Sequence, residues 1–167
     1  MRLSEMIHIP VAIVPLPLTE AVANIAYQRI LARHPALFER LEEYRTRSFG
    51  FVPTDLPVVF VAVPDKRRIE VRRKPLRDAV DVRVEAPFGA LLRLLQGHED
   101  GDALFFARDI RVEGDMEALL ALRNSLDDAR VDLASDLFGD GSPLAAMANV
   151  LMRHLSFGPG KGAKEWN

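Results

Sequence analysis

The chain has 167 residues, of which 49% are hydrophobic and 28% charged, and its formal net charge is −2. These values fit a single folded domain and exclude an intrinsically disordered chain, which has too little apolar surface to offset the entropy lost on folding. The charge excludes a dedicated nucleic-acid binder. The absence of cysteine excludes disulfides, thiolate metal sites and cysteine nucleophiles.

The first elements predicted along the chain are two helices. Thr19 is a suitable N-cap for a helix that runs to about Arg33. One face of this helix carries Val22, Ile25 and Ala26. Pro35 should open the second helix. Its apolar positions, at helical spacing, are Leu37, Phe38, Leu41 and Tyr44.

Strands are predicted next. Residues 58–63 form a continuous apolar run of β-branched character, which is typical of a well-covered strand. After a turn at 64–66, apolar and charged residues alternate around Ile69 and Val71, and again from 80 to 85. Period two with one charged side predicts a sheet with one buried face and one wet face.

The clearest helical pattern begins at Pro87 and should stop at Gly97. Its apolar stripe, at i, i+3, i+4 and i+7, is Phe88, Leu91, Leu92 and Leu95. A polar loop at 98–102 and the apolar residues 104–106 then lead to another strand with one buried side and one solvent-exposed side. This strand contains Ile110 and Val112 and ends at Gly114.

The remaining elements are predicted to be helices. Asp115 should cap a helix whose apolar residues are Met116, Leu119, Leu120 and Leu122. A further helix would carry Leu126, Ala129, Leu133 and Leu137. Pro143 should open a last amphipathic helix with Leu144, Met147, Ala148, Leu151 and Leu155 on one side. Residues 158–167 are expected to form a flexible tail.

No catalytic or metal-binding constellation is predicted. The four histidines lack the paired spacing of zinc ligands, and residues 136–141 begin like a calcium loop that has no closing glutamate. Residues 158–162 lack the flanking strand and helix of a phosphate-binding loop. Ser125 and Asp127 lie near a predicted helix start, where capping accounts for both. We therefore expect no catalytic residue, no metal and no cofactor.

Cations gather around the predicted hairpin, and they have two interpretations. The six residues are Lys66, Arg67, Arg68, Arg72, Arg73 and Lys74. They are either the solvated face of a hairpin or a membrane-contact surface. In the second case each Lys or Arg near an anionic bilayer contributes about 1 kcal/mol of attraction.

The motifs between Phe51 and Asp128 resemble the sterol carrier protein 2 family. Residues 87–97 (PFGALLRLLQG) precede residues 102–108 (DALFFAR), and residues 110–115 (IRVEGD) lead into the leucine-bearing helix. Within the family, the chain is most similar to bacterial accessory factors of ubiquinone biosynthesis. The shared features are the leader at 15–18 (PLPL), residues 104–108 and Arg123-Asn124.

The resemblance implies an α+β fold, with a mostly antiparallel sheet whose helices cover one face and enclose a hydrophobic tunnel. It implies one lipid-binding domain over residues 1–157, with an N-terminal helical extension and a core at about 51–128. From the pattern, a sheet face bearing Val82, Val84, Ile110 and Val112 would be roofed by Phe88, Leu92 and Leu95. The full set of expected lipid-binding residues is Phe60, Val82, Val84, Phe88, Leu91, Leu92, Leu95, Phe105, Phe106, Ile110, Val112, Leu119 and Leu122.

The function implied is that of a carrier rather than an enzyme. Its cargo would be an isoprenoid quinone precursor of the oxygen-independent ubiquinone route, and its protein partners the peptidase-like iron–sulfur hydroxylation proteins of that route. A cytoplasmic chain with transient contact to the membrane surface, and no nucleic-acid partner, is expected. Three alternatives stay open. They are an interaction protein that docks a partner through its last amphipathic helix, a general phospholipid or fatty-acyl carrier, and a small hydrolase or isomerase that acts on a lipid within the pocket.

Overall fold

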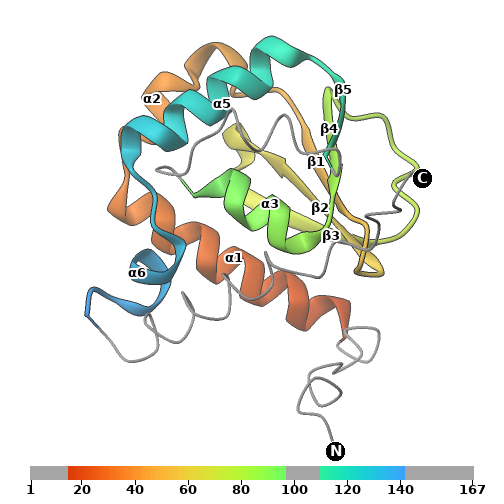
Figure 1. Cartoon of the computed structure of the whole chain (residues 1–167), viewed down its shortest axis with the longest axis horizontal. Coiled ribbons are helices and arrows are strands. Elements are labelled where there is room, and N and C mark those ends of the chain that lie inside the picture. Colours follow the sequence, from red (N-terminus) through yellow and green to blue (C-terminus); the bar gives the residue numbers. More distant parts are fainter. Residues whose placement is uncertain (1–14, 97–109, 142–167) are drawn as a thin grey trace, which may run out of the picture.

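The computed structural model describes residues 15–96 and 110–141. Helices pack against one five-stranded sheet (Figure 1). In chain order the elements are α1 Leu16–Arg33, α2 Leu37–Arg40, η3 Glu42–Tyr44, β1 Phe49–Pro53, β2 Val58–Val63, η4 Pro64–Lys66, β3 Arg68–Arg73, β4 Val82–Ala86, α3 Phe88–Leu95, β5 Arg111–Gly114, α5 Met116–Ala129 and α6 Leu133–Phe138.

The strand order is β3-β2-β1-β4-β5, and every neighbouring pair is antiparallel except β1 and β4. The predicted α+β class with a mostly antiparallel sheet is therefore confirmed. The parallel pair lies in the middle of the sheet, so the chain must cross from β3 back to β4. Residues 74–81 make that crossing.

One face of the sheet, here called the apolar face, carries a continuous set of apolar side chains. The register aligns Val71, Phe60, Phe51, Val84 and Val112 across all five strands. Helices α3 and α5 pack on this face, because both contribute to one buried cluster with the sheet. That cluster consists of Phe49, Val82, Val84, Ala86, Leu91, Leu94, Ala118 and Leu119.

The opposite face is charged only toward its edges. Its centre is a second apolar strip, Val52, Val59 and Val61, which is covered by Leu76 and Val80 of the crossing segment. Gly50 lies beneath this cover, and a Cβ atom there would be 2.9 Å from the Leu76 side chain. The prediction of a wet second face is thus correct for the edges and wrong for the centre, since the parallel β1–β4 pair places the crossing segment there.

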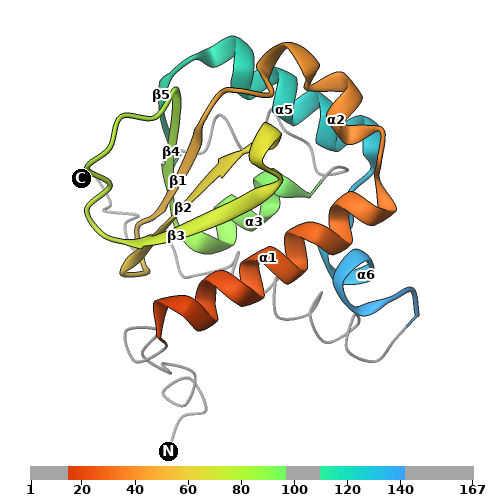
Figure 2. The same ribbon diagram turned by 180° about the vertical axis from the view of Figure 1, so that it is seen from behind.

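Helix α1 lies along the free edge of β3 and runs antiparallel to it (Figure 2). The Val71 N–H donates to Glu20 Oε2 (3.0 Å), and Asn24 exchanges two hydrogen bonds with Ile69, at 2.8 and 2.9 Å. One turn further, Gln28 Nε2 donates to the Arg67 carbonyl (2.6 Å). The i, i+4, i+8 spacing of these side chains lets one helix face satisfy backbone groups that an edge strand otherwise leaves unpaired.

One sequence-based expectation for α1, the N-cap, is wrong. The helix begins at Leu16 with Pro15 as its N-cap, and Thr19 lies inside it, because Pro17 is compatible with a first helical turn. Val22 and Ile25, on the apolar face that the sequence indicated, are exposed at 59% and 58%. The face turned toward the protein carries the polar side chains that bond β3 and also the buried Leu31.

Other boundaries also differ. Strand β1 was not predicted, because Gly50 and Pro53 disfavour a strand and its role as the centre of the sheet is not visible locally. The second predicted helix is short and continues as the 3₁₀ turn η3. Helix α5 continues through Leu126 to Ala129, and the break falls at Arg130, whose φ is 52°.

Most of the predicted elements are confirmed. These are the strands at 58–63, around 69–71, around 82–84 and at 111–114, the helix that follows Pro87, and the helix capped by Asp115. The Asp115 side chain accepts a hydrogen bond from the Ala118 N–H at 3.0 Å. Gly97, residues 104–106, the last predicted helix and the tail lie outside the described residues.

Asp81 ties the beginnings of β1 and β4 to the end of β5. Its Oδ2 accepts hydrogen bonds from the Ser48 N–H and Oγ (2.7 and 2.8 Å), and its N–H is paired with Ser48 Oγ (2.9 Å). These hydrogen bonds lower the pKa of Asp81. Its carbonyl accepts the Asp115 N–H, and a Cβ at Gly114 would lie 2.0 Å from that same oxygen, so glycine is required there.

The edge contacts predict a stability effect at Asn24. Asn24→Ala removes the pair of hydrogen bonds to Ile69 and should lower the free energy of unfolding by about 1–3 kcal/mol in urea denaturation. Asn124→Ala, at an exposed position of α5, is the matched control and should change it by less than about 0.5 kcal/mol. Equal effects of the two substitutions would contradict the edge-covering role of α1.

The Asp81 contacts predict a pH-dependent effect. Because the folded state lowers the pKa of Asp81, its contribution is present above the unfolded value of about 3.9 and is lost as the pH falls through the folded value. Asp81→Asn should therefore reduce the free energy of unfolding at pH 7. The difference in this free energy between the variant and the parent protein should disappear below about pH 4. A difference in unfolding free energy that stays constant down to pH 3 would contradict this role of the Asp81 carboxylate. Ser48→Ala should reproduce part of the loss at pH 7.

Candidate functional site

Three phenylalanines, here called the aromatic cluster, lie half-buried on the apolar face. Phe51 and Phe60 are partners across β1 and β2. The Phe88 ring, at the beginning of α3, stacks on Phe60 with a centroid distance of 6.2 Å and an interplanar angle of 26°. The Phe88 N–H donates to Asp55 Oδ1 (2.8 Å), which fixes the first turn of α3 above the sheet. Apolar rings that are only half-buried can contact a ligand without rebuilding the core.

Four of the expected lipid-binding residues lie instead in packed core. Val82 and Val84 are fully buried, and Leu91 and Leu119 are nearly so, all in the cluster between the sheet and helices α3 and α5. Protein side chains fill the space around them. These four side chains are part of the core and have no surface exposed for a ligand.

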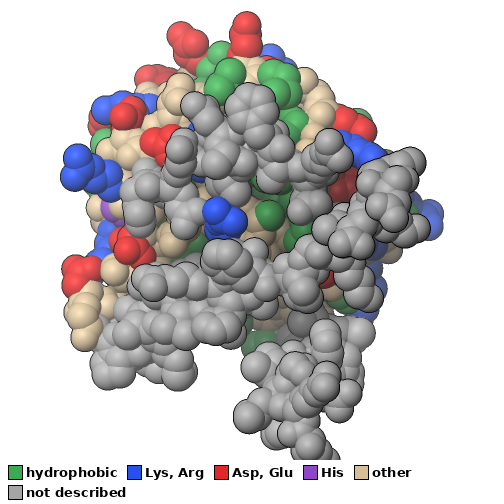
Figure 3. All heavy atoms as spheres, in the orientation of Figure 1, with side chains coloured by type: hydrophobic (Ala, Val, Ile, Leu, Met, Phe, Trp, Pro, Cys, Tyr) green, Lys and Arg blue, Asp and Glu red, His purple; other side chains and the backbone are tan. Residues whose placement is uncertain are grey.

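The other expected residues in the described ranges are half-buried. They are Phe60, Phe88, Leu92, Leu95, Ile110, Val112 and Leu122. Leu92 and Leu95 do not form the expected roof over the sheet, because Leu91 and Leu94 take that side of α3. They pack against a second cluster: Leu37, Leu41, Leu126, Val131 and Leu133. Hydrophobic side chains reach the surface in the region of α3 (Figure 3). Phe105 and Phe106 lie outside the described residues.

Two buried polar side chains hold the end of α3. Arg123 of α5 donates from Nη1 to the Leu94 carbonyl (2.9 Å) and from Nε to Asp127 Oδ2 (3.1 Å). Gln96 Oε1 accepts the Leu133 N–H at 2.9 Å. The sequence contained a signal for Arg123, since it shares a helix face with Leu119 and Leu126 and so interrupts an apolar stripe with a charge. Sequence reasoning assigned it no role.

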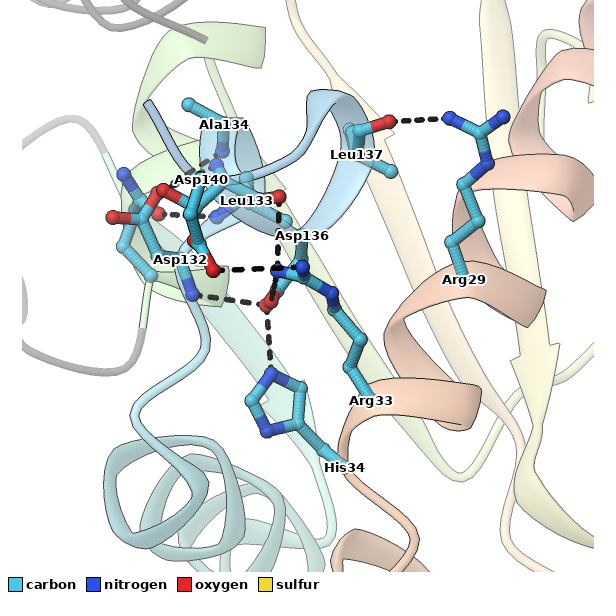
Figure 4. Close-up of polar contacts among 11 residues, drawn as sticks. Arg29, Arg33, His34, Asp132, Leu133, Ala134, Asp136, Leu137 and Asp140 are labelled. Atoms are coloured by element: carbon cyan, nitrogen blue, oxygen red, sulfur yellow. Dashed lines mark hydrogen bonds and ion pairs between the residues drawn. The ribbon is translucent and has the colours of Figure 1, made fainter. Parts of the chain in front are cut away.

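A polar joint connects α1 to α6 (Figure 4). His34 Nε2 lies 2.7 Å from Asp136 Oδ2, and the same carboxylate accepts the Asp132 N–H at 3.1 Å. Arg33 donates to the Ser135 carbonyl (3.0 Å), and Arg29 donates to that of Leu137. Cations on the last carbonyls of a helix stabilise its C-terminal end, so the joint docks a six-residue helix that is too short to be stable alone.

The described residues offer no metal cluster and no membrane-spanning helix. No group of three or more His, Asp or Glu side chains among them could hold a metal ion. None of the helices in those ranges is long and apolar enough to cross a bilayer. The Ser125 hydroxyl donates to the Ala121 carbonyl (2.7 Å), a bond within its own helix, while His34 contacts Asp136.

The structure separates the six expected membrane-contact cations by what they touch. Lys66 and Arg68 form ion pairs with Glu70 and Glu20, both at 3.7 Å. The Arg67 guanidinium lies over the Phe38 ring, 5.0 Å from its centroid.

The remaining three lie toward the end of β3. Arg72 pairs with Glu70 (2.6 Å), a hydrogen bond that lowers the pKa of Glu70, and it also pairs with Asp78. The Lys74 ammonium donates to the Pro53 carbonyl. Arg73 is exposed. Most of these charges are therefore engaged within the protein.

The fold and the site together define an α+β domain that presents an apolar, aromatic-bearing sheet face beneath helices. The model of the SCP-2 sterol transfer family matches residues 27–127. The chain belongs to this family, which confirms the resemblance read from residues 51–128. A search of the curated proteins finds no match.

Solved structures support the fold. The chain is similar to a structure described as "UbiJ-SCP2 Ubiquinone synthesis protein", with a TM-score of 0.56 and 22% identity, over 71% of this chain and 98% of that one. Weaker likenesses are to the apo sterol carrier protein 2 of Yarrowia lipolytica (TM-score 0.44, 12% identity, 71% and 97% covered) and to the sterol carrier protein domain 2 of Helicoverpa armigera (0.45, 18%, 65% and 91%).

Proposed function

We propose that this protein is a non-enzymatic lipid carrier that holds isoprenoid quinone precursors for ubiquinone biosynthesis by the oxygen-independent route. The observation that carries the proposal is the aromatic cluster, which stays half-buried on a sheet face that is otherwise apolar. Membership of the SCP-2 sterol transfer family supports a lipid cargo, and the likeness to a ubiquinone synthesis protein supports the pathway.

A prenyl chain suits such a surface. Burial of apolar area contributes about 25 cal/mol per Å², or about 0.8 kcal/mol for each CH₂. A chain laid against Phe60 and Phe88 therefore gains affinity with each carbon and needs no polar anchor. Affinity should thus depend more on the chain than on the head group.

The proposed partners follow from the proposed cargo. They are the peptidase-like iron–sulfur hydroxylation proteins that would act on the bound precursor. The proposed compartment is the cytoplasm, with transient contact to a membrane from which the lipid is exchanged.

The apolar stripe of α1 is the surface we propose for membrane contact. Leu18, Val22 and Ile25 share one side of the helix and are 55–59% exposed. The cations of β3 lie alongside, because α1 and β3 are joined by the Glu20, Asn24 and Gln28 contacts. An exposed apolar stripe beside basic residues is the pattern of an interfacial helix on an anionic bilayer.

The aromatic cluster predicts which substitutions weaken cargo binding. Phe60→Ala and Phe88→Ala should each weaken binding of an isoprenoid quinone to delipidated protein by roughly tenfold or more, since each removes a ring from the proposed contact surface. Phe38→Ala is the matched control, because Phe38 is also half-buried but belongs to α2. Fluorescence titration gives the affinities, and mass spectrometry of lipids extracted from the purified protein gives the natural cargo.

The same titration separates the alternatives. Tighter binding of phospholipid or fatty acid than of any isoprenoid would replace the quinone proposal with a general carrier. No saturable binding of any lipid would end the carrier proposal and favour an interaction protein.

The α1 stripe predicts a defect in vesicle association. Val22→Glu with Ile25→Glu should reduce sedimentation with anionic vesicles several-fold, and high salt should weaken the parent protein's association, because exposed charges are screened over about 8–10 Å at 0.1–0.15 M salt. Leu120→Glu is the control, at a position of α5 that is 50% exposed. All three substitutions are at the surface, so melting temperatures should stay unchanged. Equal vesicle binding of both variants would contradict the proposal.

A further inference from the structure

The end of β3 and the segment that crosses to β4 border an open, basic hollow. Its volume is about 300 Å³, and it is lined by Arg72, Arg73, Lys74, Pro75, Leu76, Arg77 and Asp78. The segment is drawn in yellow-green at the right of Figure 1. Leu76 is buried against Val52, Val59 and Val61 on the opposite face of the sheet, so the floor of the hollow is anchored in the core. The hollow is therefore separate from the aromatic cluster, which lies on the apolar face.

Charge is unbalanced around this hollow. Its lining holds four cations and a single carboxylate, Asp78. Arg72 is neutralised by Glu70 and Asp78, and the Lys74 ammonium is held by the Pro53 carbonyl. The side chains of Arg73 and Arg77 are exposed and form no ion pair or hydrogen bond with the described residues. Two exposed arginines thus line the hollow, and neither has a carboxylate partner among the residues that the structure describes.

The chemistry of the lining selects the ligand. A guanidinium presents donors in a planar fork that matches two oxygens of a phosphate, and two such groups beside one hollow offer several charge-assisted hydrogen bonds. The restricted volume favours a compact anion, and Asp78 is already paired with Arg72. We propose that this hollow is a binding site for a phosphate group, carried either by a lipid head group or by a soluble phosphate ester. The site goes beyond the cargo proposal and does not depend on which lipid the apolar face holds.

Inorganic phosphate is the first probe. In ¹H–¹⁵N spectra of the full chain, titration with phosphate should shift the amides of residues 72–78 in a saturable manner. The double variant Arg73→Gln, Arg77→Gln should lose this response, with an affinity reduced roughly 30-fold, equivalent to about 2 kcal/mol at about 1 kcal/mol for each cation. The matched control is Arg111→Gln with Arg130→Asn, which removes two exposed cations elsewhere and should keep the response.

Vesicles distinguish the two sources of phosphate. If phosphatidic acid vesicles bind the parent protein more tightly than the double variant, while phosphatidylcholine vesicles bind neither, the site receives a head group. Saturable binding of inorganic phosphate without any vesicle difference assigns the site to a soluble ester. Absence of localised amide shifts with phosphate, or equal shifts in the double variant, overturns the proposal. Cargo binding by the double variant should stay unchanged, so failure here is distinct from failure of the carrier proposal.

Discussion

The parallel pairing of β1 with β4 is the constraint on which the rest of the structure depends. Antiparallel neighbours can be joined by short turns, but a parallel pair needs a connection that crosses the sheet. Here the β2–β3 hairpin and residues 74–81 make that return, and the crossing part lies on the opposite face. The helices α3 and α5 are left to cover the apolar face. The parallel pairing thus places the crossing segment on the opposite face of the sheet and the helices α3 and α5 on the apolar face.

Helix α1 covers the edge of the sheet, which leaves α3 and α5 to cover the apolar face. Its polar side chains are held by the backbone of β3, so the helix lies at the edge of the sheet rather than over it. Val82 and Val84 of β4 are completely buried beneath α3 and α5, and Val71 of β3 is buried as well. Phe51 and Phe60, on the two strands between them, are half-buried.

Local patterns allowed most of the elements to be predicted, but not their partners. Alternation around Val82 and the helical stripe after Pro87 are properties of short segments, and both predictions are confirmed. Strand β1 was missed because it contains a glycine and a proline, which are unusual in a strand. Gly50 is needed there because the crossing segment packs closely against it. For the candidate site, Phe60 and Phe88 were named, yet Val82 and Leu91 could not be told from ligand-facing residues. Burial depends on what packs above a side chain, and periodicity carries no information about that.

Helix α1 acts toward β3 as a surrogate strand, and this has a consequence for how the protein behaves when the helix is displaced. Its side chains satisfy one donor and acceptor after another along an edge that would otherwise recruit a second chain. A chain whose α1 detaches presents an open β-template, ready for domain swapping or for runaway polymerisation. Helix α1 therefore protects the protein against edge-to-edge aggregation. The contacts of Glu20, Asn24 and Gln28 with β3 hold the helix in that position.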